Sequence, residues 1–388
     1  MDEYDLIVVG GGPAGSTLAR ALTKRNWRVL VVDKATFPRD KTCAGWVTPA
    51  VLRSLEVDTA DYARENVLQP IHRFRIGLMG QPPVDNDHGD EPVSYGIRRC
   101  EFDHYLLERS GADKALGEKL RSLEHRNGHW EVNGRWRAPW LVGAGGHFCP
   151  VAARLGEGPG GHEQAVTAKE VEFEMTPEQS RQCAARGDTP ELWFCRDLKG
   201  YAWVFRKDDY LNIGLGRQDN HQLSAHLEDF VQFMKDTGRI PEDLPGRYKG
   251  HAYLLHGRAR RPLTAENCLL VGDAAGLAYD QSGEGIRPAV ESSLMAAELL
   301  DRFSDNPETV RAEYEKVIRE RFGKRGDEHS GPQLPEWVKT TLAPPLMRTG
   351  WFTRKVVTER WFLHEQVPPL APLQGASRAA SGESQVAR

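Results

Sequence analysis

Hydrophobic positions near the start of the chain follow two different periods. Residues 5–9 form a short apolar, β-branched run and residues 29–32 form another, each long enough for one buried strand. Between the two runs, Leu18, Ala19 and Leu22 recur at the spacing of one helix face. This order predicts a strand, a helix and a second strand.

The pattern changes at about residue 166 and changes back after residue 255. Helical spacing covers 223–237, and short apolar or alternating segments predict strands at 168–173, 192–195, 201–206, 211–215 and 251–255. The apolar run 268–271 then predicts a further buried strand, followed by a helix that begins near Gly285. We interpret 166–255 as a sheet-based lobe inserted into the N-terminal domain.

Other segments are predicted from turn residues and breakers. Residues 130–140 alternate around Asn133-Gly134, which predicts a hairpin, and 140–146 predicts a strand ending in a glycine turn. Residues 81–91 are rich in Pro, Asp and Gly, which predicts an exposed turn or flap. Residues 334–365 mix aromatic and basic side chains; they fit a cover of the core, a lid or a membrane contact, and the prolines favour a core or lid role.

The length of 388 residues indicates two or three lobes. We divide the chain into a discontinuous first domain (1–72, 96–165, 256–325), an inserted second domain (73–95, 166–255), a C-terminal helical cover (326–372) and a disordered tail (373–388). The net charge of −4 gives no basic footprint for nucleic acid, and no run of 18 apolar residues is present to span a membrane. The N-terminus leads straight into a strand, which leaves no room for a signal peptide. Six scattered cysteines without metal-ligand spacing predict free thiols, no metal and a cytoplasmic location; the oligomeric state stays open.

The first strand ends in a candidate nucleotide clamp. Gly10, Gly12 and Gly15 form G-x-G-x-x-G, a pattern in which glycines allow a tight turn, close approach to a pyrophosphate and close packing of helix on strand. Asp33 stands at the end of the second strand, 18 residues after Gly15, where a carboxylate can bind a ribose hydroxyl. The sequence therefore predicts a dinucleotide site.

Three later places carry candidate chemistry. Cys43 and Trp46 belong to a Cys-Ala-Gly-Trp loop just beyond Asp33, where the thiol fits a gate, a proton donor or simply a small residue that lets the loop pack. Arg99 enters a helix, where it fits either a phosphate contact or a solvated surface position. Glu284, in a Gly-Glu-Gly helix start, fits an acid, a relay or a solvated helix-start carboxylate, and His147 fits a structural histidine better than a catalyst.

Taken together, three motifs resemble one flavoprotein superfamily: G-x-G-x-x-G at 10–15, R-x-x-F-D at 99–103 and G-D-A-A-G at 272–276 with its helix start. This fold is shared by p-hydroxybenzoate hydroxylase-like enzymes, FAD-dependent halogenases and geranylgeranyl reductases, and the resemblance covers roughly residues 1–325. It implies an α/β fold with a Rossmann-type, glutathione reductase-like three-layer FAD domain, an inserted β-sheet substrate domain and a helical C-terminal region. The implied FAD-binding residues are Gly10, Gly12, Pro13, Ala14, Gly15, Asp33, Lys34, Arg99, Gly272, Asp273, Gly283, Glu284, Gly285 and Ile286.

Two features resemble the geranylgeranyl reductase branch. Cys43-Ala44-Gly45 is similar to that family's Cys-Gly-Gly loop, although Trp46 follows here. The strand beginning at Tyr201 is similar to its Tyr-x-Trp-x-Phe-Pro strand, with Arg206 in place of the proline. The resemblance implies reduction of C=C bonds in an apolar, isoprenoid-like substrate by hydride from reduced flavin, with Cys43, Trp46, Tyr201 and Trp203 as candidate catalytic residues.

Departures from the family patterns keep other functions open. The hydroxylases carry an Asp-Gly pair for FAD and NAD(P)H where this chain has Gly145-Gly146, and with one nucleotide fingerprint any NAD(P)H must dock transiently. The alternative function is a monooxygenase that hydroxylates an aromatic or protein-borne substrate through a flavin C4a-hydroperoxide. A peripheral membrane contact or a protein substrate is compatible with the aromatic C-terminal segment.

Overall fold

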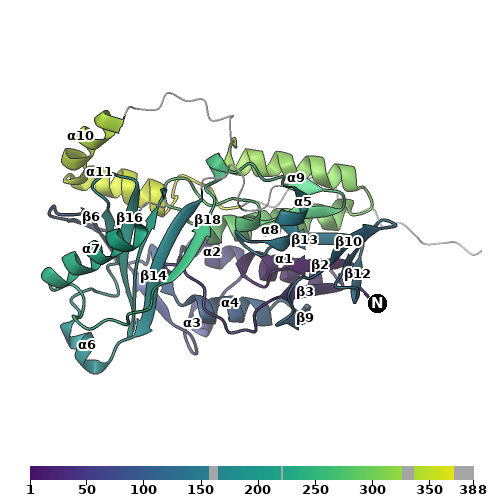
Figure 1. Cartoon of the computed structure of the whole chain (residues 1–388), viewed down its shortest axis with the longest axis horizontal. Coiled ribbons are helices and arrows are strands. Elements are labelled where there is room, and N and C mark those ends of the chain that lie inside the picture. Colours follow the sequence, from purple (N-terminus) through teal and green to yellow (C-terminus); the bar gives the residue numbers. More distant parts are fainter. Residues whose placement is uncertain (157–164, 220–221, 326–335, 371–388) are drawn as a thin grey trace, which may run out of the picture.

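The structure of the protein is a computed structural model that describes residues 1–156, 165–219, 222–325 and 336–370. The molecule is elongated, with a parallel sheet toward one end and a large, mostly antiparallel sheet toward the other (Figure 1). Among the described residues, none of the helices combines the length and the apolar character needed to cross a bilayer.

The N-terminal motif lies in a six-stranded sheet. Its strands, in spatial order, are β19 (Thr264–Ala265), β20 (Cys268–Leu270), β13 (Trp140–Gly143), β2 (Leu6–Val9), β3 (Val29–Asp33) and β9 (Asp113–Leu116). All neighbours are parallel except the edge pair β19 and β20. Since β2, β13 and β20 are completely buried, their sequences are continuous apolar runs.

Helices and a second small sheet pack around these strands. Helices α1 (Pro13–Thr23), α4 (Arg99–Glu108) and α8 (Ile286–Phe303) pack together, and α9 (Pro307–Phe322) packs on α8. The small sheet has the order β1 (Asp2–Glu3), β12 (Trp136–Ala138), β11 (His129–Val132) and β10 (Leu123–Arg126). It contributes Trp130 and Trp136 to the same hydrophobic core.

The second lobe is a seven-stranded sheet. Its order is β18 (Lys249–Tyr253), β14 (Val166–Glu174), β17 (Tyr210–Arg217), β16 (Gly200–Lys207), β15 (Glu191–Phe194), β6 (Arg73–Leu78) and β7 (Val84–Asp87). Side chains alternate between its faces: Ala202 and Val204 pack with α7 (Leu223–Asp236), whereas Trp203 and Phe205 belong to a separate cluster on the opposite face. The predicted period-two pattern of this strand is confirmed.

A three-stranded sheet and the C-terminal segments lie next to that opposite face. The sheet has the order β4 (Trp46–Val47), β8 (Ser94–Ile97) and β5 (Leu68–Ile71). The C-terminal segments are α10 (Glu336–Met347), α11 (Gly350–Phe352) and a π-helical segment, η4 (Thr353–Phe362). The remaining elements are α2 (Pro49–Ser54), α3 (Thr59–Tyr62), α5 (Pro150–Leu155), α6 (Pro177–Gln182) and the short helices η1 (His256–Arg258) and η2 (Gly272–Ala274).

Most long periodic elements were predicted, and one prediction is wrong. Residues 81–91 are not simply a flap, because Val84–Asp87 is an edge strand paired with β6, and Asn86 is buried. The Pro, Asp and Gly residues that suggested a loop flank this strand or point outward from an edge, where such residues are tolerated. The predicted disordered tail, 373–388, lies outside the described residues.

Candidate functional site

The glycine motif forms a tight turn between β2 and α1. Gly10 has a φ of +118°, and a Cβ there would lie 2.4 Å from the carbonyl oxygen of Ala144. A Cβ on Gly15 would lie 1.8 Å from the carbonyl oxygen of Gly10, so only glycine allows α1 to approach the turn. At Gly12, the N-cap of α1, a Cβ would meet only side-chain atoms, and the first residues of the helix, Pro13 and Ala14, are buried. The helix N-terminus therefore presents backbone donors beside a close backbone crossing.

Asp33 fixes the same turn from the end of β3. Its carboxylate accepts hydrogen bonds from the backbone N–H groups of Gly11, at 2.7 Å, and Ala35, at 2.8 Å. A carboxylate has further lone pairs, so these bonds orient it without using all its acceptor capacity. Lys34, in contrast, is exposed.

A group of charged side chains stands at the N-terminus of α1. Arg99 makes two 2.8 Å bonds to Asp103, and Arg39 Nη2 lies 3.1 Å from the same carboxylate. Although burial opposes the charged form, Asp103 and the Cys43 thiol raise the pKa of Arg99. Arg39 Nη2 would be 3.3 Å from a Cβ at Gly12, and its Nη1 is buried without a hydrogen-bond partner. The guanidinium that approaches the glycine turn through Nη2 thus keeps an unpaired donor in Nη1.

Asp273 faces this group from the turn after β20. Gly272, with a φ of +57°, gives the turn its shape, and a Cβ on Gly285 would lie 2.7 Å from Asp273 Oδ1. That oxygen is buried and has no hydrogen-bond partner, while Oδ2 is 3.9 Å from His251 Nε2. Burial alone would favour the neutral acid, but His251 and Lys41 lower the pKa of Asp273. Asp273 is therefore an ionised acceptor with a free lone pair.

Lys41 and His251 complete the polar lining. Lys41 Nζ lies 2.6 Å and 3.0 Å from the two ring nitrogens of His251. Burial lowers the pKa of Lys41 to about 8 and lowers the pKa of His251 as well. The pair adds exchangeable protons beside Asp273.

The unpaired polar atoms of these residues match the polar groups of FAD. The unpaired Arg39 Nη1 and the open helix N-terminus at Gly12 supply donors suited to a pyrophosphate. The unpaired Asp273 Oδ1 supplies an acceptor suited to a sugar or ribityl hydroxyl. Arg39 would hold the phosphates and Asp273 the hydroxylated chain.

The Cys43 loop is held from the seven-stranded sheet. Glu170 accepts the backbone N–H of Cys43 at 2.7 Å, and Asn212 Nδ2 donates to the Cys43 carbonyl at 3.1 Å and to Glu170 at 3.0 Å. Gly45 has a φ of +69°, and a Cβ there would lie 2.3 Å from the Ile97 carbonyl oxygen and 2.4 Å from Lys207 Nζ. Burial raises the pKa of Glu170 to about 7. The backbone of this loop is therefore fixed by hydrogen bonds to the sheet and by close packing at Gly45.

An aromatic cluster lies directly beyond the loop. Trp46 is buried and makes edge contacts with Phe74, Phe205 and Phe362 at ring distances of 5.5–5.7 Å. Tyr201 lies 5.2 Å from the Phe362 ring. Three of the four candidate catalytic residues therefore share one apolar cluster, whose members include Trp46, Tyr201 and Trp203. The indole N–H of Trp203 is engaged by Asn212 at 2.7 Å, which ties the cluster to the loop anchor.

Glu284 sits at the start of α8, close to Tyr201. Tyr201 donates its hydroxyl proton to the Ser282 carbonyl, and both carboxylate oxygens of Glu284 are buried without a hydrogen-bond partner. Burial raises the pKa of Glu284 to about 7. His364 Nε2 lies 3.5 Å from Glu284 Oε2 and 3.1 Å from Ser282 Oγ. Glu284 is therefore buried rather than a solvated helix-start carboxylate.

The flanking residues of Glu284 shape this corner. Gly283 has a φ of +70°, and a Cβ there would lie 2.3 Å from the hydroxyl of Tyr253. Ile286, the first residue of α8, is buried in a separate apolar cluster with Val47 and Phe102. Its side chain therefore packs the helix start in place.

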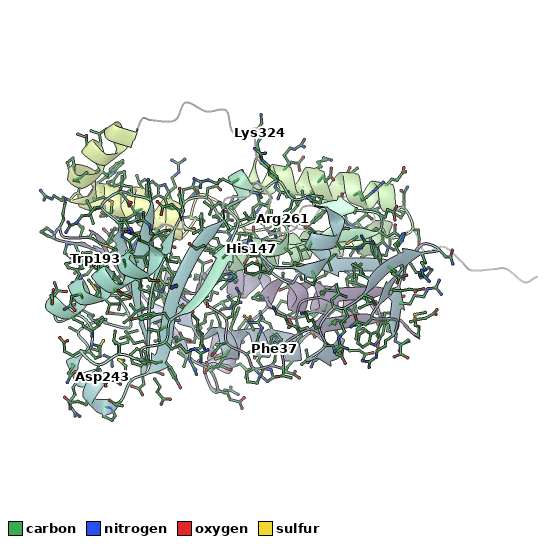
Figure 2. The ribbon with its side chains drawn as sticks, in the orientation of Figure 1. Phe37, His147, Trp193, Asp243, Arg261 and Lys324 are labelled. Carbon is green, nitrogen blue, oxygen red and sulfur yellow. The ribbon has the colours of Figure 1, made fainter. Side chains whose placement is uncertain are left out.

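His147 is buried and is held by Arg261. Arg261 Nη1 donates to the His147 carbonyl at 2.8 Å, and both side chains lie near the middle of the molecule (Figure 2). Burial, followed by the charge of Arg261, lowers the pKa of His147 to about 4. The imidazole is therefore neutral at ordinary pH.

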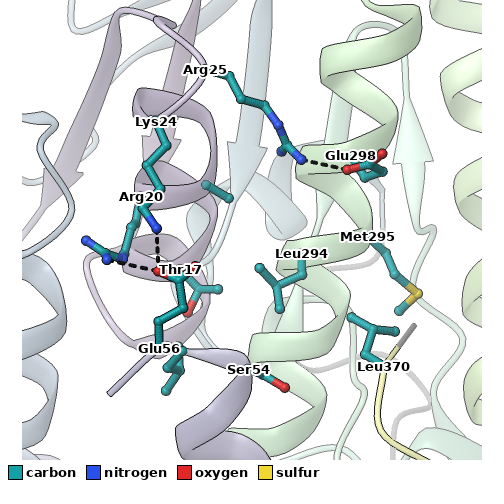
Figure 3. A pocket seen from close by; sticks show the side chains of 12 residues that line it. Thr17, Arg20, Lys24, Arg25, Ser54, Glu56, Leu294, Met295, Glu298 and Leu370 are labelled. Atoms are coloured by element: carbon teal, nitrogen blue, oxygen red, sulfur yellow. Dashed lines mark hydrogen bonds and ion pairs between the residues drawn. The ribbon is translucent and has the colours of Figure 1, made fainter. Parts of the chain in front are cut away.

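A surface cavity of about 400 Å³ lies elsewhere, between α1, α2 and α8 (Figure 3). Its rim carries the ion pairs Arg25–Glu298, at 2.6 Å, and Arg20–Glu56, at 3.1 Å. None of the predicted site residues lines it. It is therefore separate from the site formed around Gly12, Cys43 and Glu284.

Sequence reasoning missed several residues of this site. Arg39, Lys41, Glu170, His251 and His364 carry no motif. A usable signal existed only in β14, where Glu170, Glu172 and Glu174 recur at period two, so that they share one face of the strand. His364 reaches the site from a segment distant in sequence, which no local pattern reveals.

Comparison with known proteins agrees with this geometry. The model of the "FAD binding domain" family matches residues 3–300. Menaquinone reductase of Mycobacterium tuberculosis is 31% identical over 77% of this chain and 77% of its own length. Digeranylgeranylglycerophospholipid reductase of Thermoplasma acidophilum is 26% identical over 84% and 85%.

A solved structure is similar in fold. A geranylgeranyl bacteriochlorophyll reductase-like protein of Thermoplasma acidophilum superposes with a TM-score of 0.69 at 21% identity, covering 89% of this chain and 88% of that one. The family match spans far more than half of the chain, and the glycine turn, Arg99 and Asp273 described above all lie within it. The chain therefore belongs to the FAD-binding domain family, as a geranylgeranyl reductase-like FAD-dependent oxidoreductase.

Proposed function

We propose that this enzyme reduces C=C bonds of an apolar, isoprenoid-like substrate. The observation that carries the proposal is the apolar cluster of Trp46, Tyr201, Trp203 and Phe362 directly beside the Cys43 loop. Aromatic and aliphatic walls suit a hydrocarbon chain, which gains free energy simply by leaving water. The relatives named for reduction of menaquinone and of a digeranylgeranyl lipid support the same substrate class.

Bound FAD, in its reduced form, supplies the hydride for this reaction. The protein's part is to position the alkene and to provide the matching proton. Tyr201 and Trp203 orient the apolar chain, and Phe362 excludes water from it. Cys43 Sγ or Glu284 holds the proton that completes the reduction; the buried Glu284 pair with His364 favours Glu284 as the reserve of protons.

The proposed cofactor site uses eight of the fourteen predicted residues. Gly10, Gly12 and Gly15, with Asp33, bind the adenosine and pyrophosphate part, and Arg99 acts through Asp103 to position Arg39. Asp273, with Gly272 and Gly285, binds the ribityl chain. NAD(P)H is proposed as the electron donor, and it would dock transiently because the sequence has one glycine fingerprint; Gly145 stands where the hydroxylases carry Asp, so its docking would differ from theirs.

The predicted domain division and layering are kept as part of this proposal. The parallel sheet with its packed helices and its small second sheet supports a Rossmann-type, glutathione reductase-like FAD domain. The seven-stranded sheet, which combines 73–87 with 166–253, supports an inserted substrate domain. A cytoplasmic location is supported by six cysteines that are all free thiols.

The test is turnover of the purified, FAD-loaded protein without oxygen. Reduced enzyme mixed with a prenylated quinone or prenyl lipid should yield a product that gains two hydrogen atoms, and the yellow oxidised flavin should return at the same rate. Oxygen should not be needed. If instead product forms only in air and carries an added oxygen atom, the enzyme is a monooxygenase and the reductase proposal is wrong.

A further inference from the structure

Exposed apolar side chains gather on the C-terminal helices. Among the described residues, five large hydrophobic side chains are exposed, and three of them fall between 342 and 351. Leu342, Leu346 and Trp351 are 50%, 39% and 70% exposed, and together we call them the docking patch. Exposed single hydrophobics are ordinary, but a local group of this kind marks an interaction surface.

The patch is positioned by Met347, the last residue of α10, which packs against the rest of the molecule. Leu342 and Leu346 are four residues apart and share one face of α10. Met347 is 4% exposed and packs into the aromatic cluster that contains Trp46. Figure 1 shows α10 and α11 at one end of the molecule, far from the N-terminus.

Charge around the patch is opposite to that of the whole chain. Residues 341–370 contain four basic and two acidic side chains, a net charge of +2, on a chain with a net charge of −4. All four basic residues, Arg348, Arg354, Lys355 and Arg360, are exposed. This combination of Trp and Leu with nearby basic residues suits the interface of an anionic bilayer.

A series of aromatic rings leads inward from the patch. Phe352, next to Trp351, lies 6.0 Å from the Trp361 ring, which lies 6.5 Å from Phe194. Phe194 lies 5.9 Å from Tyr201. The surface patch is therefore continuous with the wall proposed to bind the substrate.

We propose that the docking patch binds the surface of an anionic phospholipid bilayer, from which an apolar substrate passes along this aromatic series to Tyr201. The inference rests on the proposed function for the identity of the cargo, but the docking itself does not. Three side chains are too few for a stable dimer, which typically needs about 800 Å² from each partner. They suffice for shallow insertion, since a fully buried Leu contributes roughly 1.5–3 kcal/mol and basic residues add to it.

The test is co-sedimentation of the FAD-loaded full chain with vesicles of phosphatidylcholine alone or mixed with phosphatidylglycerol. Wild type should bind the anionic vesicles, and L342S/L346S/W351S should bind them at least about tenfold more weakly. The single variant W351S, which removes the most exposed of the three side chains, should show an intermediate loss. Phe148→Ser, at a side chain 59% exposed outside the patch, is the matched control and should bind as wild type does.

Three results would overturn the inference: no binding by wild type, unchanged binding by the triple variant, or a dimer that the triple variant converts to monomer. Turnover separates this inference from the proposed function. The triple variant should lose turnover of a vesicle-embedded prenyl substrate while keeping turnover of a water-dispersed short prenyl analogue. Wild-type binding to vesicles without turnover of either substrate would leave docking supported and the reductase proposal contradicted.

Discussion

His364 Nε2 lies 3.5 Å from Glu284 Oε2, although the two residues are eighty positions apart in the chain. The imidazole is brought there by a backbone turn with a φ of +51°, a left-handed conformation that is uncommon outside glycine. Burial lowers the pKa of His364 to about 3 and raises that of Glu284 to about 7. Between these two values the pair thus holds its proton on the carboxyl group, beside a neutral imidazole, and it releases that proton as the pH rises through about 7.

The first prediction concerns stability against pH. Because the pKa of Glu284 rises from an ordinary 4.5 to about 7 on folding, the folded state keeps a proton that the unfolded chain releases between these values. The free energy of unfolding should therefore fall as pH rises through this window, by up to about 3 kcal/mol from this group. Glu284→Gln should remove that part of the fall in urea denaturation curves.

Glu170, whose pKa is also raised to about 7, should likewise make the free energy of unfolding fall as pH rises. The contribution of Glu284 is therefore measured as the difference between wild type and Glu284→Gln. Glu228→Gln, on the exposed face of α7, is the control and should leave the curve unchanged. Parallel pH curves for wild type and Glu284→Gln would contradict the prediction.

The second prediction concerns the anchor of the Cys43 loop. Glu170→Ala removes the acceptor of the Cys43 N–H, which leaves a buried donor unpaired at a cost of about 1–3 kcal/mol. The loop should become mobile, so alkylation of Cys43 should be faster than in wild type. Glu170→Gln keeps an acceptor oxygen and should preserve the slow rate. Both variants are measured in a Cys100→Ser background, because Cys100 is the other half-buried thiol.

The third prediction uses two glycines with almost the same backbone. Gly45 and Gly146 have φ values of +69° and +74°, so alanine at either position costs about 1–2 kcal/mol of backbone strain. At Gly45 the new methyl also meets Ile97 and Lys207, whereas nothing lies within 4 Å at Gly146. Gly45→Ala should lose roughly 1–3 kcal/mol more than Gly146→Ala in chemical denaturation. Equal losses in the free energy of unfolding would contradict the prediction, because they would mean that the contacts with Ile97 and Lys207 add no cost at Gly45.

The fourth prediction concerns cofactor affinity. Arg39 keeps a buried, unpaired Nη1 on a guanidinium whose Nη2 lies beside Gly12, and charge-assisted hydrogen bonds contribute about 1.5–3 kcal/mol. Arg39→Gln should raise the Kd for FAD about tenfold or more, measured by flavin fluorescence on titration into the cofactor-free protein. Arg121→Gln, at an exposed position, should bind FAD as wild type does.

The sequence predicted those parts of the protein that local patterns specify. The glycine turn, Asp273 and the alternating strand of Tyr201 each carry their signal within a few residues. The anchor made by Glu170 and Asn212 could not be predicted, because it depends on which strands become neighbours: β14 pairs with β17 across a separation of about forty residues. Strands β5 to β8 could not be predicted, because polar residues at edge positions interrupt their hydrophobic pattern. The contact of His364 with Glu284 could not be predicted either, because no motif near His364 indicates it.

Phe362 and His364 are two residues apart. This spacing links the packing of the aromatic cluster to the protonation of Glu284. One side of their segment closes on Trp46, and the other places the imidazole on Glu284. Arg287 fixes the segment by donating to the carbonyl oxygens of His364 and Val367. We expect a ligand that displaces Phe362 from the aromatic cluster to alter the proton affinity of Glu284 as well, so that ligand binding and protonation of Glu284 affect each other to the same extent.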